Sequence, residues 1–381
     1  MKKRLTVITG IGIIVFFQML NAQTWQSTKR ITDNSGWSGE AAITIVSSNN
    51  IHVAWMDDTP GEFEIFYQRS TDGGSSWTQK RLSWNLGWSA NPAIVVDAGN
   101  HVHVVWDDKT PGTEDIYYRM STNGGVNWAA VKRLTWSSGS SFRPSIAADS
   151  SDNLHLAWQD EAPGNSEIYY KKSTNGGSSW TTKRLTWNSG SSVRPEIAVD
   201  SSDNIHLVWR DDTSGNREIY YKKSTNVGAT WGQTKRLTWN TGLSIVPVIA
   251  TDSSNNIYVV WYDSSPGNWE LYNKKSTNGG GTWLGTRRLT WNSGSSLRPA
   301  VAVDSNGNIH LVWEEESTGN LEIFFKRSTN GGSSWTTTRL SYNSGSSQYP
   351  ALATDSSDNI HVVWKDSSPG NGEVYYKKGI Q

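Results

Sequence analysis

Carboxylates recur in this chain at two fixed positions, and a pair of carboxylates can act as acid and base on a glycosidic bond. A glycosidase needs one pair whose surroundings push the two pKa values apart, whereas this pair occurs seven times. We therefore interpret these side chains as hairpin caps or as partners of nearby Lys-Arg pairs, with seven equivalent binding pockets as the alternative. The two series are Asp57, Asp108, Asp160, Asp211, Asp263, Glu315 and Asp366, and Glu64, Asp115, Glu167, Glu218, Glu270, Glu322 and Glu373.

An aromatic series has the chemistry to bind sugars, because an indole ring offers an apolar face that can stack on a sugar ring. Its members stand where the chain enters a loop containing Asn, Ser and Asp side chains, which could bind hydroxyl groups. The alternative is that each ring fills the gap between two adjacent repeats. We predict ligand-binding residues here, six in number because Asp33 takes the remaining place. They are Trp84, Trp136, Trp187, Trp239, Trp291 and Tyr342.

Six of the seven histidines share one repeat position, with Tyr258 in the remaining repeat. Because they belong to separate repeats, they cannot converge on one metal ion, and we interpret them as packed strand residues. The chain has no Cys, which excludes disulfides, thiolate metal sites and cysteine nucleophiles. We expect no metal site and no cofactor. The six histidines are His52, His103, His155, His206, His310 and His361.

All these positions are set by a unit of about fifty-two residues that repeats seven times. A Trp at the end of the pattern I-H-L-V-W marks each unit, at spacings of 51 or 52 residues. Self-similarity at such a period is typical of repeat architectures. The marker residues are Trp55, Trp106, Trp158, Trp209, Trp261, Trp313 and Trp364.

Each unit predicts four strands, which the fourth repeat illustrates. We expect them at 195–200, 205–211, 218–224 and 232–239, separated by turns rich in Gly, Ser, Asn and Asp. The first two are apolar and should be buried on both faces, while the last is the most polar. This gradient suits a radial blade whose first strand lies near a central axis. Residues 23–381 contain no helix-period pattern, so the fold class is all-β.

The two ends of the chain predict a closed ring. The last repeat stops after its third strand, and residues 25–32 match the missing fourth strand, with Trp25 lying 52 residues before Trp77. We therefore expect a single seven-bladed β-propeller over residues 23–381, closed when the N-terminal strand completes the last blade. Closure of this kind removes exposed sheet edges.

Residues 1–22 differ from the rest of the chain. Three basic residues precede an apolar run over residues 5–20, a pattern typical of a secretory signal peptide. Removal of this segment leaves 32 basic and 35 acidic side chains, a net charge of −3. Mixed charges near neutrality argue against nucleic-acid partners and anionic lipid, and no second apolar run could span a bilayer. We expect an extracellular or periplasmic protein without membrane insertion.

Six repeats carry a related octapeptide between the third and fourth strands, such as Ser173-Thr-Asn-Gly-Gly-Ser-Ser-Trp180. It resembles the Asp-box, or BNR repeat, S-x-D-x-G-x-x-W of sialidases and related propellers, although only Asp72 keeps the aspartate. The resemblance covers residues 23–381 at repeat level. Physically the motif is a hairpin in which Asp or Asn caps the turn, Gly supplies positive φ, and Trp packs on the sheet. The motif names the fold and not the reaction.

The resemblance also implies a candidate catalytic site. Sialidases use three arginines, a Tyr–Glu nucleophile pair and an Asp acid/base, and the residue just before the Pro of each first strand (Ala in the first repeat) offers a partial match. If the chain is sialidase-like, the site residues would be Arg143, Arg194, Arg298, Tyr349 and Glu40. We expect Arg298 to lie too far from the other two arginines for all three to bind one ligand carboxylate. We also expect Tyr349 and Glu40 not to form a nucleophile pair. The full ring is Glu40, Asn91, Arg143, Arg194, Val246, Arg298 and Tyr349.

Three functions fit these observations, and near-identity of the repeats ranks them. Repeated pockets favour a secreted, non-catalytic propeller that binds glycans, because linked weak sites gain from multivalency. An enzyme would have a single site in which one blade differs from the others, so a sialidase-like exo-glycosidase comes second. The third function is a scaffold that binds extracellular surface proteins.

Overall fold

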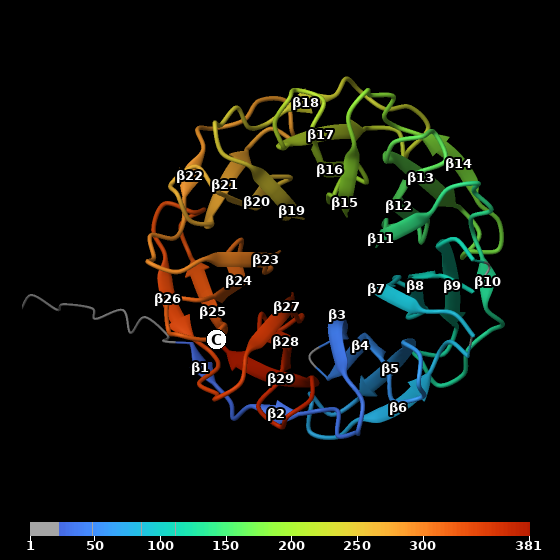
Figure 1. Ribbon diagram of the computed structural model, residues 1–381, viewed down its shortest axis with the longest axis vertical. Coiled ribbons are helices and arrows are strands. Elements are labelled where there is room, and N and C mark those ends of the chain that lie inside the picture. Colours follow the sequence, from blue (N-terminus) through green and yellow to red (C-terminus); the bar gives the residue numbers. More distant parts are fainter. Residues whose placement is uncertain (1–22, 48, 85, 111) are drawn as a thin grey trace, which may run out of the picture.

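The computed structural model describes residues 23–47, 49–84, 86–110 and 112–381. The predicted signal peptide lies outside these residues. All the regular elements among them are strands, and they form seven separate antiparallel sheets arranged as blades around a central axis (Figure 1). No described segment forms a helix of the length and apolarity needed to cross a membrane.

Six blades consist of four consecutive strands, and the seventh combines both ends of the chain. Blades one to three are β3 (Ser38–Ser47), β4 (Asn50–Asp57), β5 (Glu64–Ser70) and β6 (Thr78–Arg81); β7 (Ser89–Val96), β8 (Val102–Asp108), β9 (Asp115–Ser121) and β10 (Lys132–Arg133); and β11 (Ser141–Ala148), β12 (Leu154–Asp160), β13 (Glu167–Ser173) and β14 (Thr181–Arg184). Blades four to six are β15 (Ser192–Val199), β16 (Ile205–Asp211), β17 (Glu218–Ser224) and β18 (Lys235–Arg236); β19 (Ser244–Thr251), β20 (Ile257–Asp263), β21 (Glu270–Ser276) and β22 (Arg287–Arg288); and β23 (Ser296–Val303), β24 (Ile309–Glu315), β25 (Glu322–Ser328) and β26 (Thr336–Arg339). Blade seven is β27 (Ser347–Thr354), β28 (Ile360–Asp366) and β29 (Glu373–Ile380), with β1 (Thr24–Trp25) and β2 (Lys29–Arg30).

The N-terminal strands close the ring, as the sequence predicted. Both β1 and β2 pair with β29 in antiparallel register, with Trp25 opposite Gly379 and Lys29 opposite Tyr376. In Figure 1 the blue and red ends of the chain meet in this blade. The predicted single fourth strand is here split into two short pieces.

The second strand of each blade is the most buried, and the core lies between blades. Trp209 of β16 packs with Ala157, Ile168 and Leu185 of the preceding blade. The first strands are only half-buried, which corrects the expectation that both faces would be covered. The reason is that they line a central channel of about 580 Å³.

The Asp-box turns and the second-strand histidines both make contacts that hold the blades together. In the box of blade three, Ser173 Oγ accepts from Gly177 N (2.9 Å), and the Asn175 side chain accepts from Ser179 N (2.9 Å). A side chain at Gly177 would overlap the Tyr118 hydroxyl of blade two, so this glycine, like its equivalents in four of the other five boxes, allows two blades to approach closely. The histidines are buried, and His103 Nδ1 lies 2.8 Å from that same hydroxyl.

Both series of carboxylates have structural partners, as the sequence predicted. Each acid that opens a third strand pairs with the fourth-strand arginine of its own blade, for example Glu218 with Arg236 at 2.8 Å. Each acid after the marker Trp caps a hairpin. Asp211, for example, accepts from Ser192 Oγ (2.6 Å), Thr213 N (2.9 Å) and the Trp209 indole (3.3 Å).

Candidate functional site

The six predicted aromatic residues project into solvent. Their exposed fractions range from 58% for Trp84 to 71% for Trp136. They do not fill the gaps between blades, because buried residues such as Leu185 and Trp209 occupy those gaps. The antiparallel order of each blade places them on the face opposite the Asp-box turns. Trp84, Trp136, Trp187, Trp239, Trp291 and Tyr342 thus repeat around one face of the ring.

Each exposed ring is supported by a cation that is itself fixed in place. The Arg184 guanidinium lies 5.7 Å from the centre of the Trp187 ring, donates to Glu167 (3.0 Å) and donates through Nε to the Thr186 carbonyl (2.7 Å). Lys222 of the next blade lies 6.0 Å from the same ring and donates to the Leu185 carbonyl. The buried Glu167 thus fixes the position of Arg184. Arg184 in turn orients the Trp187 indole through a cation–π contact.

The polar loop groups beside these rings serve the fold. The Asn188 side chain donates to Asp211 and Ser192, and the Asn216 amide donates to two loop carbonyls, those of Asn240 and Gly242. The expectation that the Asn side chains of these loops would bind sugar hydroxyls therefore does not fit Asn188 or Asn216.

The second candidate site is the mouth of the central channel. The third residue of each first strand sits in a β-bulge with φ between 46° and 55°, a left-handed conformation that non-glycine residues rarely adopt. Where the preceding blade supplies an acceptor, that acceptor holds the bulge: Arg143 N donates to Asp107 (2.9 Å) and Arg194 N to Gln159 (2.9 Å). The seven ring residues, Glu40, Asn91, Arg143, Arg194, Val246, Arg298 and Tyr349, all line the channel.

The three ring arginines differ in their partners. Arg298 pairs with Glu314 at 2.7 Å and lies 4.3 Å from the centre of the Tyr349 ring. Among the described residues, Arg143 and Arg194 have no ion-pair partner, and burial lowers the pKa of Arg194 to about 10, with the Arg143 charge adding to the effect. Tyr349 shares no hydrogen bond with Glu40 within the described part of the chain.

Sequence reasoning missed a fourth arginine, whose charge interacts with that of Arg143. Arg210 lies in β16, one residue after the marker Trp209, and its buried Nε has no hydrogen-bond partner. Desolvation lowers its pKa, and the nearby Arg143 charge lowers it further. The available signal was that the position after the marker Trp varies from repeat to repeat while its neighbours recur.

An acidic cleft adjoins Arg143. It encloses about 380 Å³ and is lined by Glu40, Trp88, Asp107 and Arg143, among others. Burial raises the pKa of Asp107 to about 7, although bonds from Arg143 N and from the Asn91 side chain oppose that shift. Burial also raises the pKa of Glu40, against the charges of the three ring arginines. A carboxyl group that titrates near neutrality can exchange protons with a substrate.

Comparison with protein families decides the affiliation of the chain, since the model of the BNR repeat-containing family matches residues 89–343. The chain belongs to this family. No curated protein matches it. This match confirms the resemblance to the BNR repeat that the octapeptides indicated, and the protein is a BNR-repeat propeller.

Three glycan-acting enzymes share this fold but are distant in sequence. An ulvan lyase bound to -[GlcA(1-4)Rha3S]- has a TM-score of 0.69 at 11% identity, covering 93% of this chain and 95% of that one. An α-L-arabinofuranosidase from Fusarium graminearum has a TM-score of 0.58 at 12% identity, covering 77% and 93%. The Hadza microbial sialidase Hz136 has a TM-score of 0.55 at 12% identity, covering 88% and 74%. At such identities the likeness establishes the fold alone.

Proposed function

We propose that this BNR-repeat propeller is a secreted, non-catalytic protein that binds glycans through its exposed aromatic residues. The observation that carries the proposal is that six equivalent rings are more than half exposed and oriented by fixed cations. An exposed Trp costs solubility and contributes little to the fold, so six in register are better explained by a ligand. The glycan-active structures that share the fold support the same class of ligand.

Repetition fits a polymeric ligand. A single stacked sugar ring binds weakly, but a polysaccharide or a clustered glycan can occupy several blades at once. Secretion, with residues 1–22 as signal peptide, belongs to the proposal because such ligands lie outside the cell. The alternative partner is an extracellular surface protein.

The test is a glycan microarray probed with the protein and with a triple variant, Trp187→Ala, Trp239→Ala and Trp291→Ala. We expect the intact protein to bind multivalent glycans and the variant to lose at least about tenfold in avidity, because three adjacent sites are removed. The melting temperature should stay nearly unchanged, since these rings are exposed.

The matched control replaces buried-face residues of the same loops conservatively, with Thr186→Ser and Thr238→Ser, and should bind as the parent does. An intact protein that binds no glycan, or a triple variant with undiminished avidity, would refute the proposal. Binding to cell-surface protein after enzymatic removal of glycans would favour the scaffold.

A second candidate function is hydrolysis of an acidic sugar at the channel mouth. The observation in its favour is the combination of Arg143, Arg194 and Arg210, which lack ion-pair partners among the described residues, with the neighbouring acid Asp107. Guanidinium groups bind carboxylates in paired hydrogen bonds. This set replaces the Arg298 of the sialidase-like site by Arg210, because Arg298 is already paired with Glu314.

Hydrolysis of a fluorogenic sialoside and a fluorogenic uronide tests this second function. If Asp107 is the general acid, its protonated form is needed, so activity should fall as the pH rises above about 7. Asp107→Asn should abolish activity while keeping an acceptor for Arg143 N, and the aromatic triple variant should keep it. Absence of hydrolysis of both substrates by the intact protein would exclude this activity on them.

A further inference from the structure

One turn of the propeller differs from its copies by a histidine. In five blades the turn between the first two strands holds an Asp that binds the Asn four residues later, as Asp200 binds Asn204. In blade two that Asn is replaced by His101. The exchange keeps the bonds of the turn, because His101 N donates to Asp97 Oδ1 (2.8 Å) and His101 Nδ1 lies 2.8 Å from Asp97 Oδ2. Blade two therefore gains an imidazole without losing its turn.

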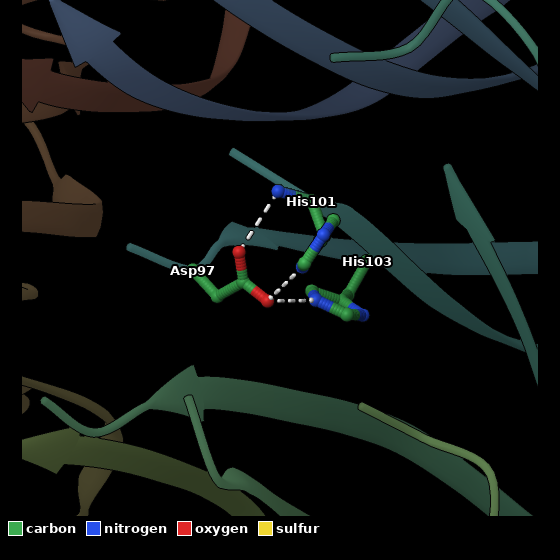
Figure 2. A group of neighbouring side chains, drawn as sticks. All are labelled: Asp97, His101 and His103. Carbon is green, nitrogen blue, oxygen red and sulfur yellow. Dashed lines mark hydrogen bonds and ion pairs between the residues drawn. The ribbon is translucent and has the colours of Figure 1, made fainter. Parts of the chain in front are cut away.

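This imidazole joins a second one on the same carboxylate. His103 Nε2 lies 3.1 Å from Asp97 Oδ2, and Figure 2 shows the three side chains directed toward one another. The potential ligand atoms of Asp97, His101 and His103 all lie within 4.8 Å of one another. Ligands of a tetrahedral zinc ion are about 3.3 Å apart, given metal–ligand distances near 2.0–2.2 Å. Small side-chain rotations would accommodate an ion at their centre.

The surroundings of His103 suit a metal ligand. Its Nδ1 lies 2.8 Å from the Tyr118 hydroxyl, which in turn donates to the Gly176 carbonyl at 3.3 Å. With the proton on Nδ1 donated to Tyr118, Nε2 presents its lone pair toward Asp97. A ligating histidine that donates its other ring N–H to the protein has a fixed orientation and higher basicity. No proton need be lost, since the neutral imidazoles only change tautomer.

Burial and charge complete the site. The side chains of Asp97 and His103 are 1% and 0% exposed, whereas that of His101 is 36% exposed, so an ion would enter from the His101 side. The Asp152 carboxylate on the neighbouring turn accepts from Ala98 N (2.8 Å) and acts electrostatically on His103. Two carboxylates at the site would balance the charge of a divalent cation.

We propose that Asp97, His101 and His103 bind one divalent transition-metal ion, represented by Zn²⁺, with a further coordination position open to solvent. Two imidazoles and one carboxylate favour zinc, nickel or copper over calcium and magnesium, which prefer oxygen ligands. The site lies at the Asp-box end of blade two, on the face opposite the exposed aromatic rings. It is therefore independent of the proposed glycan binding.

The experiment is calorimetric titration of the protein with Zn²⁺, together with thermal unfolding with and without the ion. We expect one zinc ion per chain and a higher melting temperature when it is bound, because a ligand that binds the native state stabilises it. Ca²⁺ should produce neither effect. Absence of a zinc equivalent in the intact protein would overturn the proposal.

Two variants make the test specific. His101→Asn restores the turn found in the other blades, so it should keep the metal-free melting temperature and lose the zinc equivalent. Asn204→His places a second imidazole beside Asp200 and His206, which lie 2.9 Å apart, and should raise the stoichiometry to two. Retention of zinc by His101→Asn would refute the site. An unchanged stoichiometry in Asn204→His would refute the claim that the single exchange creates it.

Discussion

A chain that begins at residue 34 is expected to melt well below one that begins at residue 23 and to self-associate. The deletion removes β1 and β2, so the outer edge of β29 loses its partners. It also removes Arg30, which pairs with the fully buried Glu373 at 2.6 Å. Loss of one partner of a buried pair costs about 3–5 kcal/mol, which corresponds to a melting temperature lower by roughly 4–7 °C in a domain of this size. The exposed strand edge promotes pairing between chains.

The N-terminal segment also holds three blades together, which adds to the expected loss. Trp25 packs edge-on against Phe325 of blade six at 5.0 Å, and the Gln68 side chain of blade one donates to the Ile31 carbonyl at 2.7 Å. Calorimetry and light scattering measure the two effects. Arg236→Ala removes the equivalent pair within blade four and serves as a control that leaves every sheet edge covered. A shortened chain that stays monomeric and equally stable would show that the ring does not depend on this strand.

Sequence periodicity predicted the second and third strands well, because each of these strands begins and ends where strand-forming residues give way to turn residues such as Gly, Ser, Asn and Asp. In blade four the expected ranges 205–211 and 218–224 match β16 and β17. The fourth strand is shorter than expected: only Lys235 and Arg236 pair with β17. Thr238 then turns inward and accepts from Ile219 N through its hydroxyl, at 2.9 Å, which ends the pairing. Such a side-chain bond leaves no trace in a hydrophobic pattern.

The candidate sites were less predictable, because they depend on contacts between blades. Spacing places Arg143, Arg194 and Arg298 at one repeat position, yet among the described residues only the Arg298 guanidinium forms an ion pair, with Glu314. Arg210 belongs to another series, and only the ring geometry brings its charge near Arg143. The repeated tryptophans were hard to predict for the same reason. Both the marker series, such as Trp209, and the series after the fourth strand, such as Trp187, lie near the blade ends. Only the packing between blades shows that the first series is buried and the second exposed.

Trp209, in blade four, and Trp187, just before that blade, should therefore differ in how much their replacement by Ala lowers the free energy of unfolding. Trp209 has no exposed surface, packs against blade three and donates to Asp211. Trp209→Ala should lower the free energy of unfolding by about 3–5 kcal/mol, the usual cost of emptying an aromatic core site. Trp187 is 67% exposed, so Trp187→Ala should cost about 1 kcal/mol or less, chiefly the lost cation–π contact.

Denaturant unfolding measures the loss of stability in both variants, and a glycan-binding assay measures the change in avidity. Trp187→Ala should weaken binding at nearly constant stability, whereas Trp209→Ala should reduce stability and affect binding only as far as the fold is lost. Equal destabilisation by the two variants would mean that Trp187 also belongs to the core. In that case its exposure would not mark a binding surface, and the argument for six aromatic sites would lose its main support.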